Sequence, residues 1–463
     1  MAQPGTPRVG TAGTAVRQAS LREHNLALVL RHIAGATRPP SRADLATATG
    51  LTRATVSALV DDLIGGRLLA EVDPTPRTGA GRPALGLVLS PAGPAGLGLE
   101  INVDYLAARV LDLTGAVRHR EVHRADLRPL PATEVLDRVA ELAAAARAAA
   151  RRQGLPLAGA ALAVPGLVTP AGVVRLAPNL GWRDVDAAAA LGAHPALAGV
   201  PVAVENEANL AALGELHTNA TGPATFLYIS GEVGIGAGIV LHGALFRGAR
   251  GWSGELGHVP VHPRGRPCRC GARGCLEQYA GQEAILRAAG LTGPGPRAAG
   301  LTGPGPRAAE PSGPGPRAAG PSGAGPRAAG ARPALGVPAE GVARLAELAE
   351  AGDPAALGAL AEAAGALGVA VAGVLNLLDL ETVVLGGVYA PLARWLCPPV
   401  EAEIRRRVLT AAWSPVAVRP SLLGADAAAT GAAGSVVRAV LAEPARWLAT
   451  AGGGAPGRGA AAG

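Results

Sequence analysis

Metal-binding side chains are concentrated in one short stretch of the sequence. Three of the four cysteines and one histidine follow the pattern H-x9-C-x-C-x4-C, formed by His258, Cys268, Cys270 and Cys275. Three thiolates and an imidazole are the ligand set of a structural tetrahedral Zn²⁺ site. The alternative interpretation is a disulfide with a spare thiol, but Cys268 and Cys270 are too close to bridge comfortably and the chain shows no signal peptide. We therefore expect a structural zinc ion beside the carboxylates of Glu255 and Glu277.

The net charge of +7 is distributed unevenly along the 463 residues. Residues 1–90 carry ten Arg against six acidic residues, residues 291–330 carry four Arg against one Glu, and the remainder balances at 28 of each sign. A basic N-terminal part favours duplex DNA, whereas 2% aromatic residues speak against base stacking on single strands. Because no uninterrupted apolar run reaches the ~18 residues of a membrane-spanning helix, we expect a cytoplasmic protein without membrane contact.

The N-terminal part has the pattern of a helix-turn-helix. Residues 21–34 place apolar side chains on one helical face. Ser41 and Asp44 form a capping-box pattern for a short second helix, which Gly50 ends in a tight turn. Thr52 can then cap a third helix, and the side chains of this helix that face inward are Val56, Leu59, Val60 and Leu63. Three helices of these lengths, with a Gly turn before the third, predict a helix-turn-helix.

The outer face of the third helix and the segment after it suggest contacts to DNA. Short polar groups and one Arg are suited to the floor of the major groove, and these are Thr52, Arg53, Thr55 and Ser57. Two short apolar runs, 68–72 and 84–89, predict a hairpin wing whose Arg77 and Arg82 can reach phosphates or a narrow minor groove. A three-helix protein-interaction module is the alternative interpretation, and the Arg- and Gly-rich tip of the wing favours DNA.

The central part of the chain alternates apolar strands with Ala- and Leu-rich helices, which predicts an α/β architecture. Four tandem decapeptides, each containing the sequence GPRAA, interrupt it at residues 291–330. Gly and Pro are too abundant there for the segment to bury a core, so we expect a disordered insert. A weak basic arm that tethers DNA is the alternative. Residues 1–19 and 448–463 are expected to be disordered tails.

Taken together, these motifs resemble the ROK family (repressors, open reading frames, kinases) over roughly residues 20–445, apart from the insert. The stretch GELGH at 254–258 and CRCGARGCLE at 268–277 are similar to the signature and zinc motif of the family. Supporting matches are VPGLV at 164–168, APNLGW at 177–182, VENEAN at 204–209, GIGAG at 234–238 and VVLGG at 383–387.

The resemblance implies an actin-like, sugar-kinase-type pair of α/β lobes that close over a sugar. This ROK domain would comprise residues 91–290 and 331–447, and residues 20–90 would form a winged helix-turn-helix of the kind found in the regulators of the family. The resemblance also implies sugar contacts by Asn179, Asn206, Glu207, Glu255, His258 and Glu277. Amides and carboxylates suit paired hydroxyl groups, although Asn179 or Asn206 alone would be interpreted as a turn residue or a helix cap.

The phosphate-binding motifs depart from the pattern of the family kinases. Their first motif reads D-x-G-G-T, and residues 100–104 read EINVD, which removes both glycines and adds Asp104. Their second motif reads G-T-G-x-G, and residues 232–236 read EVGIG, with Glu232 in place of a glycine. Like charges at ~4 Å cost about 1–4 kcal/mol, so we expect poor ATP binding. The position of the kinase base holds Glu207 instead of Asp, so we expect no catalytic residue.

We therefore predict a sugar-responsive transcriptional regulator of the repressor type that binds a sugar or sugar phosphate without phosphorylating it. Its expected partners are double-stranded operator DNA and a second copy of the chain, in a homodimer or homotetramer. Structural zinc is the one expected cofactor. An ATP-dependent sugar kinase of the ROK family is the alternative, and a zinc-stabilised corepressor that binds no small molecule is a third interpretation.

Overall fold

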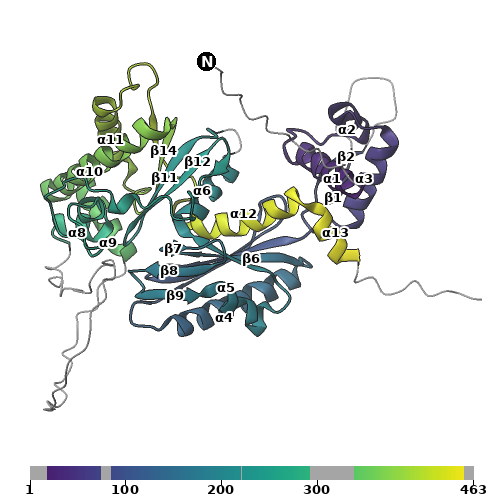
Figure 1. Cartoon of the computed structure of the whole chain (residues 1–463), viewed down its shortest axis with the longest axis horizontal. Coiled ribbons are helices and arrows are strands. Elements are labelled where there is room, and N and C mark those ends of the chain that lie inside the picture. Colours follow the sequence, from purple (N-terminus) through teal and green to yellow (C-terminus); the bar gives the residue numbers. More distant parts are fainter. Residues whose placement is uncertain (1–17, 74–84, 220–221, 292–337, 453–463) are drawn as a thin grey trace, which may run out of the picture. The chain divides into compact units, whose positions relative to one another are not determined.

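The computed structural model describes residues 18–73, 85–219, 222–291 and 338–452, which divide into two compact units (Figure 1). Unit 1 extends from the N-terminus to Ala224 and also contains residues 238–254 and the chain from Ala425 onward. Unit 2 contains Thr225–Ala237 and Glu255–Gly424. Strands and helices alternate through both units after an N-terminal helical part, which confirms the predicted fold class.

Unit 1 begins with the predicted helix-turn-helix elements. They are α1 (Gln18–Ala34), α2 (Arg42–Thr49), α3 (Arg53–Gly65) and the antiparallel pair β1 (Leu69–Val72) and β2 (Gly86–Leu89). Ser41 and Asp44 make both bonds of a capping box, and Gly50 ends α2 with a φ of 72°. The segment that joins β1 to β2 lies outside the described residues, and the predicted wing residues Arg77 and Arg82 lie in it.

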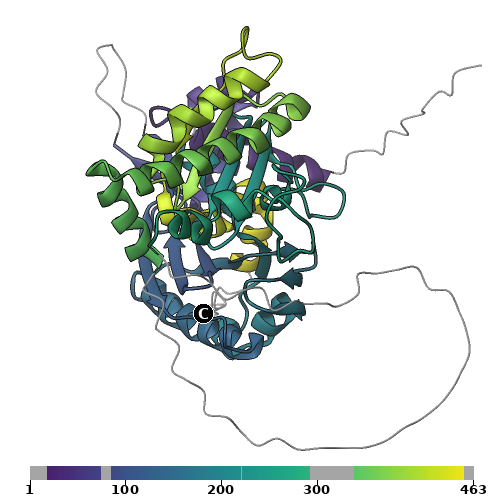
Figure 2. The same ribbon diagram turned by 90° about the vertical axis from the view of Figure 1, so that its left-hand side faces the viewer.

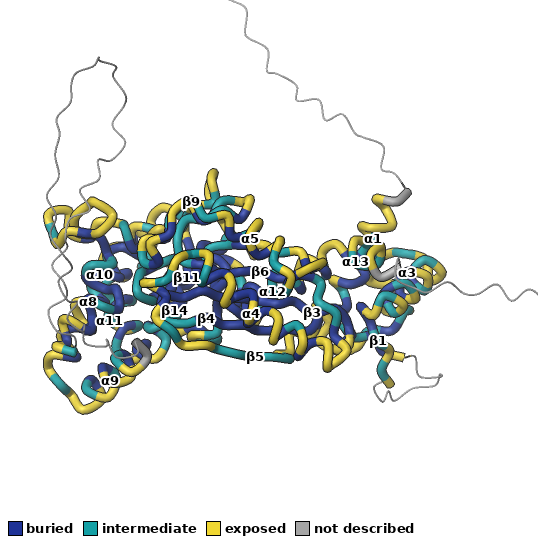
Figure 3. Tube along the Cα trace, turned by 90° about the horizontal axis from the view of Figure 1, so that it is seen from below, coloured by how far each residue is buried: buried dark blue, intermediate teal, exposed yellow. Residues whose placement is uncertain are grey.

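The main sheet of unit 1 has the order β10–β6–β3–β4–β5. Its strands are β3 (Ala95–Ile101), β4 (Tyr105–Leu111), β5 (Val117–Arg124), β6 (Leu157–Val164) and β10 (Val202–Asn206). Helices α12 (Ala427–Ala442) and α4 (Ala132–Arg152) pack against it, α12 above and α4 below in Figure 1. Buried residues are concentrated along β3, β6 and α12 (Figure 3).

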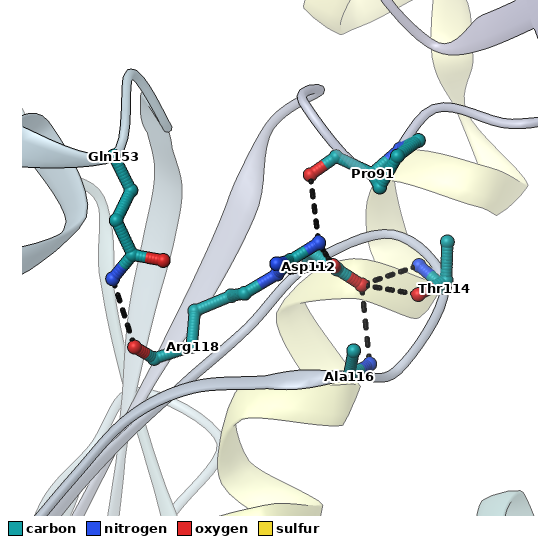
Figure 4. Close-up of polar contacts among 6 residues, drawn as sticks. All are labelled: Pro91, Asp112, Thr114, Ala116, Arg118 and Gln153. Carbon is teal, nitrogen blue, oxygen red and sulfur yellow. Dashed lines mark hydrogen bonds and ion pairs between the residues drawn. The ribbon is translucent and has the colours of Figure 1, made fainter.

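The turn between β4 and β5 is organised around one buried carboxylate (Figure 4). Asp112 is completely buried and accepts hydrogen bonds from the backbone N–H groups of Thr114 and Ala116 at 2.8 and 3.1 Å. Arg118 Nε donates to the second oxygen of Asp112 at 2.6 Å, and Arg118 Nη2 donates to the carbonyl of Pro91 at 3.3 Å. The turn is thereby bonded to the segment that follows the helix-turn-helix.

The rest of unit 1 surrounds the carboxyl ends of β6 and β10. A small antiparallel sheet has the order β7–β8–β9, and α5 and α6 follow β9 and β10 in the chain. These elements are β7 (Leu167–Val168), β8 (Val173–Ala177), β9 (Trp182–Asp186), α5 (Ala187–Ala193) and α6 (Glu207–Thr218). Helix α6 packs closely on α12.

The last helix of unit 1, α13 (Pro444–Gly452), corrects one expected boundary. Residues 448–452 were expected to belong to a disordered tail, but they form the end of this helix. The physical reason is that Trp447 and Leu448 pack against the core of the helix-turn-helix. Residues 453–463 lie outside the described residues, and so do residues 292–330 of the expected insert.

Unit 2 is built on parallel strands covered by long helices. Strand β14 pairs in parallel with β11 and β15, and β12 continues the sheet beyond β11 to the short β13. The strands of this sheet are β11 (Phe226–Gly231), β12 (Ile235–Leu241), β13 (Ala244–Leu245), β14 (Thr382–Gly387) and β15 (Ala417–Pro420). Of these, β13 and the end of β12 belong to unit 1. The boundary between the units passes through β12.

The helices of unit 2 include α10 and α11, which lie side by side (Figure 2). The set comprises α7 (Glu277–Ala280), α8 (Gln282–Ala288), α9 (Pro338–Glu350), α10 (Pro354–Leu378) and α11 (Ala393–Arg407). Helix α10 is long and apolar enough to cross a bilayer. Its buried face packs on α7, α8 and α11, as expected for the core helix of a domain.

Candidate functional site

The four predicted metal ligands converge in unit 2. The ligand atoms of His258, Cys268, Cys270 and Cys275 all lie within 4.8 Å of one another, and all three cysteines are free thiols. Cys270 Sγ lies 3.7 Å from Cys275 Sγ, and Cys268 Sγ lies 3.8 Å from His258 Nδ1. Tetrahedral Zn²⁺ with Zn–S bonds of about 2.3 Å places its sulfur ligands about 3.8 Å apart. The group therefore has the donors of a tetrahedral metal site at about the spacing that such a site needs, and no disulfide joins the described cysteines.

Backbone hydrogen bonds hold the loop that carries these cysteines. Cys268 N–H donates to Ala272 O at 2.9 Å, and Gly271 N–H donates to Cys268 O at 3.1 Å, which closes a tight turn around Cys270. Gly274 adopts a φ of 73°, and a Cβ added there would lie 1.6 Å from His262 O. Only glycine therefore fits beside Cys275, so the cluster depends on this residue as well as on its ligands.

Burial favours the neutral thiol form of the cluster when no cation is bound. Burial and the neighbouring thiols raise the pKa of Cys275 to about 12. Burial likewise raises the pKa of Cys268, so a bound cation is what would favour the thiolate forms. Burial raises the pKa of Glu255 and of Glu277, and His258 opposes this shift in both. His258 thus lies electrostatically close to both predicted sugar-binding carboxylates of unit 2.

The predicted sugar contacts of unit 1 lie at the carboxyl end of β10. Asn206 caps α6, with Oδ1 accepting from the N–H groups of Ala208 and Asn209 at 2.9 and 3.1 Å. Its Nδ2 donates to Gly166 O at 3.0 Å. Glu207 is the first residue of α6 and is buried. Asn206 is therefore a helix cap in this structure. One of its two amide hydrogens is used in the bond to Gly166.

Asn179 lies in the turn between β8 and β9. Leu180 N–H donates to Ala177 O at 3.1 Å. This short-range bond closes the turn that contains Asn179, as expected for a turn residue. A Cβ on Gly166, which has a φ of 114°, would lie 3.0 Å from Ala177 Cβ. Gly166 therefore adjoins this turn and also accepts the amide bond of Asn206. The structure thus brings the neighbourhoods of Asn179 and Asn206 together around Gly166, while Glu255, His258 and Glu277 belong to unit 2.

Two further charged residues of this region were missed from the sequence. Glu205 Oε1 accepts from Asn206 N–H at 3.0 Å and from Asn209 Nδ2 at 3.1 Å, and Glu205 Oε2 accepts from Arg247 Nε at 2.7 Å. Glu205 lies inside the family motif and that motif was the available signal. Arg247 follows β13 and no sequence pattern marked it. The ion pair of Glu205 and Arg247 thereby holds the backbone at Asn206 and Glu207 in place.

Polar side chains of the first phosphate motif form hydrogen bonds within unit 1. Glu100 is buried, and its Oε1 accepts from Tyr105 Oη at 2.6 Å while Oε2 accepts from Ala429 N–H at 3.2 Å. Burial raises the pKa of Glu100 to about 7 despite these two bonds. Asn102 Oδ1 accepts from Val103 N–H at 2.6 Å. The polar groups of this turn therefore bond to the protein itself.

The second phosphate motif lies in unit 2, between β11 and β12. Glu232 N–H donates to Gly234 O at 2.8 Å. A Cβ added to Gly387 would lie 2.6 Å from Glu232 Oε1. The carboxylate therefore lies against the backbone at the end of β14, beside the glycine pair Gly386-Gly387.

The predicted DNA-binding face is on α3. Thr52 Oγ1 caps the helix by accepting from Thr55 N–H at 3.1 Å, and Thr52 and Arg53 are exposed. The inward face is buried as predicted, with Val56, Leu59, Val60 and Leu63. Asp61 pairs with Arg42 at 2.8 Å and Asp62 pairs with Arg22, so two acidic side chains of α3 are neutralised from neighbouring helices. This lowers the electrostatic cost of bringing α3 close to phosphates.

Comparison with known proteins relates both parts of the chain to described families. Residues 96–438 match the family model described as ROK family, and residues 25–73 match the IclR helix-turn-helix domain. The xylose repressor of Bacillus spizizenii is 32% identical over 276 residues, which cover 58% of this chain and 69% of that protein. A glucokinase of Halalkalibacterium halodurans is 31% identical over 283 residues, covering 59% of this chain and 74% of that protein.

Solved structures give the same result. A ROK family transcriptional regulator, described as a homolog of the E. coli MLC protein, superposes with a TM-score of 0.68 at 25% identity over 93% of this chain and 98% of that chain. A ROK family glucokinase from Streptomyces griseus, in complex with glucose and AMPPNP, superposes with a TM-score of 0.56 at 26% identity over 74% of this chain and 98% of that chain. The regulator match extends over more of this chain than the kinase match.

Proposed function

Because the chain belongs to the ROK family, we propose that it is a sugar-responsive, DNA-binding repressor that binds its effector without phosphorylating it. The observation that carries this proposal is the first phosphate motif. Asn102 and Val103 replace its two glycines and Asp104 follows them, while Glu100, at the position of the motif's own Asp, bonds to Ala429 N–H in the amino-terminal turn of α12. Backbone N–H groups of this kind are what an anionic phosphate needs, and here a protein carboxyl group takes one of them.

The DNA-binding half of the proposal rests on α3. In a helix-turn-helix the amino-terminal residues of the recognition helix contact base edges, and Thr52, Arg53, Thr55 and Ser57 occupy those positions. Arg77 and Arg82 are proposed to contact phosphates or the minor groove from the wing. A homodimer or homotetramer would present paired helices to a palindromic operator. A regulator of this kind acts in the cytoplasm and has no membrane partner.

The sugar-binding half rests on the polar side chains that the family resemblance implies. Asn179 and Asn206 would donate amide hydrogens to hydroxyl groups, and Glu207 would accept from one of them. Glu255, His258 and Glu277 are proposed as the contacts of unit 2. Xylose repressors and glucokinases among the relatives make D-xylose, D-glucose and their phosphates the first effectors to test.

Zn²⁺ is the proposed structural cofactor of unit 2. The cluster has three thiol sulfurs and one imidazole nitrogen within 4.8 Å of one another, and this donor set favours Zn²⁺ over the harder cations. His258 Nδ1 lies next to Cys268 Sγ, so a bound ion would orient the ring. It would also hold α7, which begins with Glu277 two residues after Cys275. The ion would supply rigidity, and none of its bonds is needed for chemistry.

The kinase alternative is disfavoured by the base as well as by the phosphate motifs. Glu207 replaces the Asp of the family kinases, and the extra methylene moves the carboxylate by about 1 Å, which costs roughly 100-fold in a positioned reaction. The proposal is tested with purified full-length protein and a duplex selected from a random-sequence pool. We expect at least one sugar of the panel to change duplex affinity, with no ADP formed from ATP. Turnover at the rates of sugar kinases would refute the proposal.

A further inference from the structure

The carboxyl-terminal helices of the chain share a hydrophobic core with the helix-turn-helix. The buried residues of α1–α3 form one cluster with Val437 and Val440 of α12. Leu441, Trp447 and Leu448 pack against the same cluster. Helix α13 contacts both α1 and α3, and α12 contacts α1. The DNA-binding part is therefore packed on the last two helices of the chain, far from it in sequence.

The closest of these contacts is at the carboxyl end of the recognition helix. Gly66 caps α3, and its carbonyl accepts a hydrogen bond from Trp447 Nε1 at 3.0 Å. A Cβ added to Gly66 would lie 2.1 Å from Leu448 Cδ2. The φ of Gly66 is −80°, a value that any residue adopts. The absence of a side chain at this position leaves room for Leu448 of α13, and an added Cβ would have to displace the end of that side chain.

The opposite end of α12 packs against the helix that carries the predicted sugar contacts. Helix α6 begins at Glu207 and is capped by Asn206. A Cβ on Gly431 of α12 would lie 1.7 Å from Leu210 O and 2.9 Å from Gly214 N of α6. The two helices therefore meet backbone to backbone, without a side chain between them that could absorb a displacement.

Helix α12 is also seated closely on the sheet and held at its amino-terminal end. A Cβ on Gly98 of β3 would lie 2.1 Å from Ala429 O. Arg109 of β4 donates to Thr430 Oγ1 at 2.6 Å and pairs with Asp426 at 2.6 Å. One rigid helix thus extends from the sugar-binding end of α6 to the core of the helix-turn-helix.

We propose that α12 and α13 couple the effector-binding end of α6 to the recognition helix α3, and that Trp447 is the positioning residue of this coupling. The inference rests on the proposed function, because it assigns a route by which a sugar changes operator affinity. Coupling requires an element whose arrangement both sites influence. A small displacement of α6 would move α12, and α13 would carry that movement to Gly66.

The first test compares Trp447→Phe and Trp447→Ala in the full chain, with Trp413→Phe and Trp413→Ala as matched controls. Trp413 is 81% exposed and lies in unit 2 after α11. Phe keeps one aromatic ring but removes the indole N–H donor, so we expect operator affinity to fall at least about 5-fold for Trp447→Phe, since one neutral hydrogen bond is worth about 1 kcal/mol. We expect a fall of more than about 10-fold for Trp447→Ala. The ratio of operator affinities without and with sugar should shrink in both variants.

Sugar affinity separates positioning from a loss of folding. Isothermal titration with D-xylose or D-glucose should give the wild-type affinity within about twofold for every Trp447 variant. A protein that had merely lost structure would lose sugar binding in proportion. Operator affinity and sugar ratio within twofold of wild type for Trp447→Ala, or equal losses for Trp413→Ala, would overturn the inference.

A second test uses the contact between Gly66 and Leu448 directly. Gly66→Ala places a methyl group where Leu448 lies and should lower operator affinity, while Leu448→Ala makes room for that methyl. We expect the double variant to bind the operator several-fold more tightly than Gly66→Ala alone. Absence of this rescue would refute the contact as a determinant of α3. If the wild-type protein itself showed no sugar effect on any duplex, the proposed function would fail instead, whatever these variants do.

Discussion

Replacing Glu100 by Gln should make the protein more stable at alkaline pH and remove one component of its pH dependence. The pKa of Glu100 is raised from 4.5 to about 7, first by burial. The pKa of such a carboxyl group is higher in the folded than in the unfolded state. Its contribution to stability is fully present below the unfolded pKa and is lost as pH rises through the folded pKa. The side chain is only 3% exposed, so solvent screens this penalty little.

The size of the effect follows from the shift. About 2.5 pKa units at 1.36 kcal/mol each give an upper limit of about 3 kcal/mol above pH 8. For a unit of this size that corresponds to roughly 6–12 °C in melting temperature. Gln can accept the bond from Ala429 N–H and donate to Tyr105 Oη, so the two hydrogen bonds need not be lost. The loss begins near the unfolded pKa of 4.5 and is complete above the folded pKa of about 7, so the variant and the wild type should melt close together only at about pH 4.

Differential scanning fluorimetry of both proteins from about pH 4 to pH 8.5 measures this. Tyr105→Phe is the matched control, because the Tyr105 bond lowers the pKa of Glu100 and its removal should deepen the alkaline loss of stability. Two melting curves that stay parallel over the whole pH range would refute the reasoning, since Glu100 would then be ionised at no cost in the folded protein.

Three further predictions concern the metal, the DNA and the sugar. Cys270→Ser should lower the zinc content after dialysis from about one ion per chain to a small fraction, and it should lower the melting temperature. Mass spectrometry of the metal and calorimetry measure these two effects. Unchanged metal content would overturn the ligand assignment. Arg53→Ala should weaken binding of the selected duplex by roughly 5- to 100-fold, since a good bidentate Arg–guanine contact is worth about 1–3 kcal/mol, and an unchanged affinity in fluorescence anisotropy would remove Arg53 from the recognition face. Glu207→Gln should weaken sugar binding by roughly 10- to 100-fold, because a charge-assisted hydrogen bond is worth about 1.5–3 kcal/mol; equal titration curves would show that Glu207 contacts no sugar.

The local features of the helix-turn-helix could be predicted because their causes lie within a few residues. The capping box of Ser41 and Asp44 depends on a spacing of three residues. Gly50 is in the left-handed region because it follows the last turn of α2. The metal cluster was likewise predictable, since three of its ligands lie within eight residues of one another and few chemistries use that combination.

The features that depend on distant parts of the chain could not be predicted. The cap that Asn206 forms on α6 has local partners, but its amide is bonded to Gly166, which lies 40 residues earlier. Glu100 receives its second bond from Ala429, 329 residues later. The tail boundary at residue 448 was placed by composition, and the packing of Trp447 on Gly66 that extends the helix has no local signal. Each of these results from tertiary contacts that override what the neighbouring sequence prefers.

The central claim is that sugar binding is coupled to DNA release without phosphoryl transfer. The most direct measurement records duplex anisotropy and ADP formation in one sample. This sample contains the zinc-loaded full-length protein bound to a fluorescent selected duplex, with ATP and Mg²⁺ present. Titration with D-xylose, D-glucose or their phosphates should change the anisotropy of the duplex, while coupled detection of ADP stays at the level without sugar. A rise of ADP with sugar, or an anisotropy that no sugar changes, would contradict the claim.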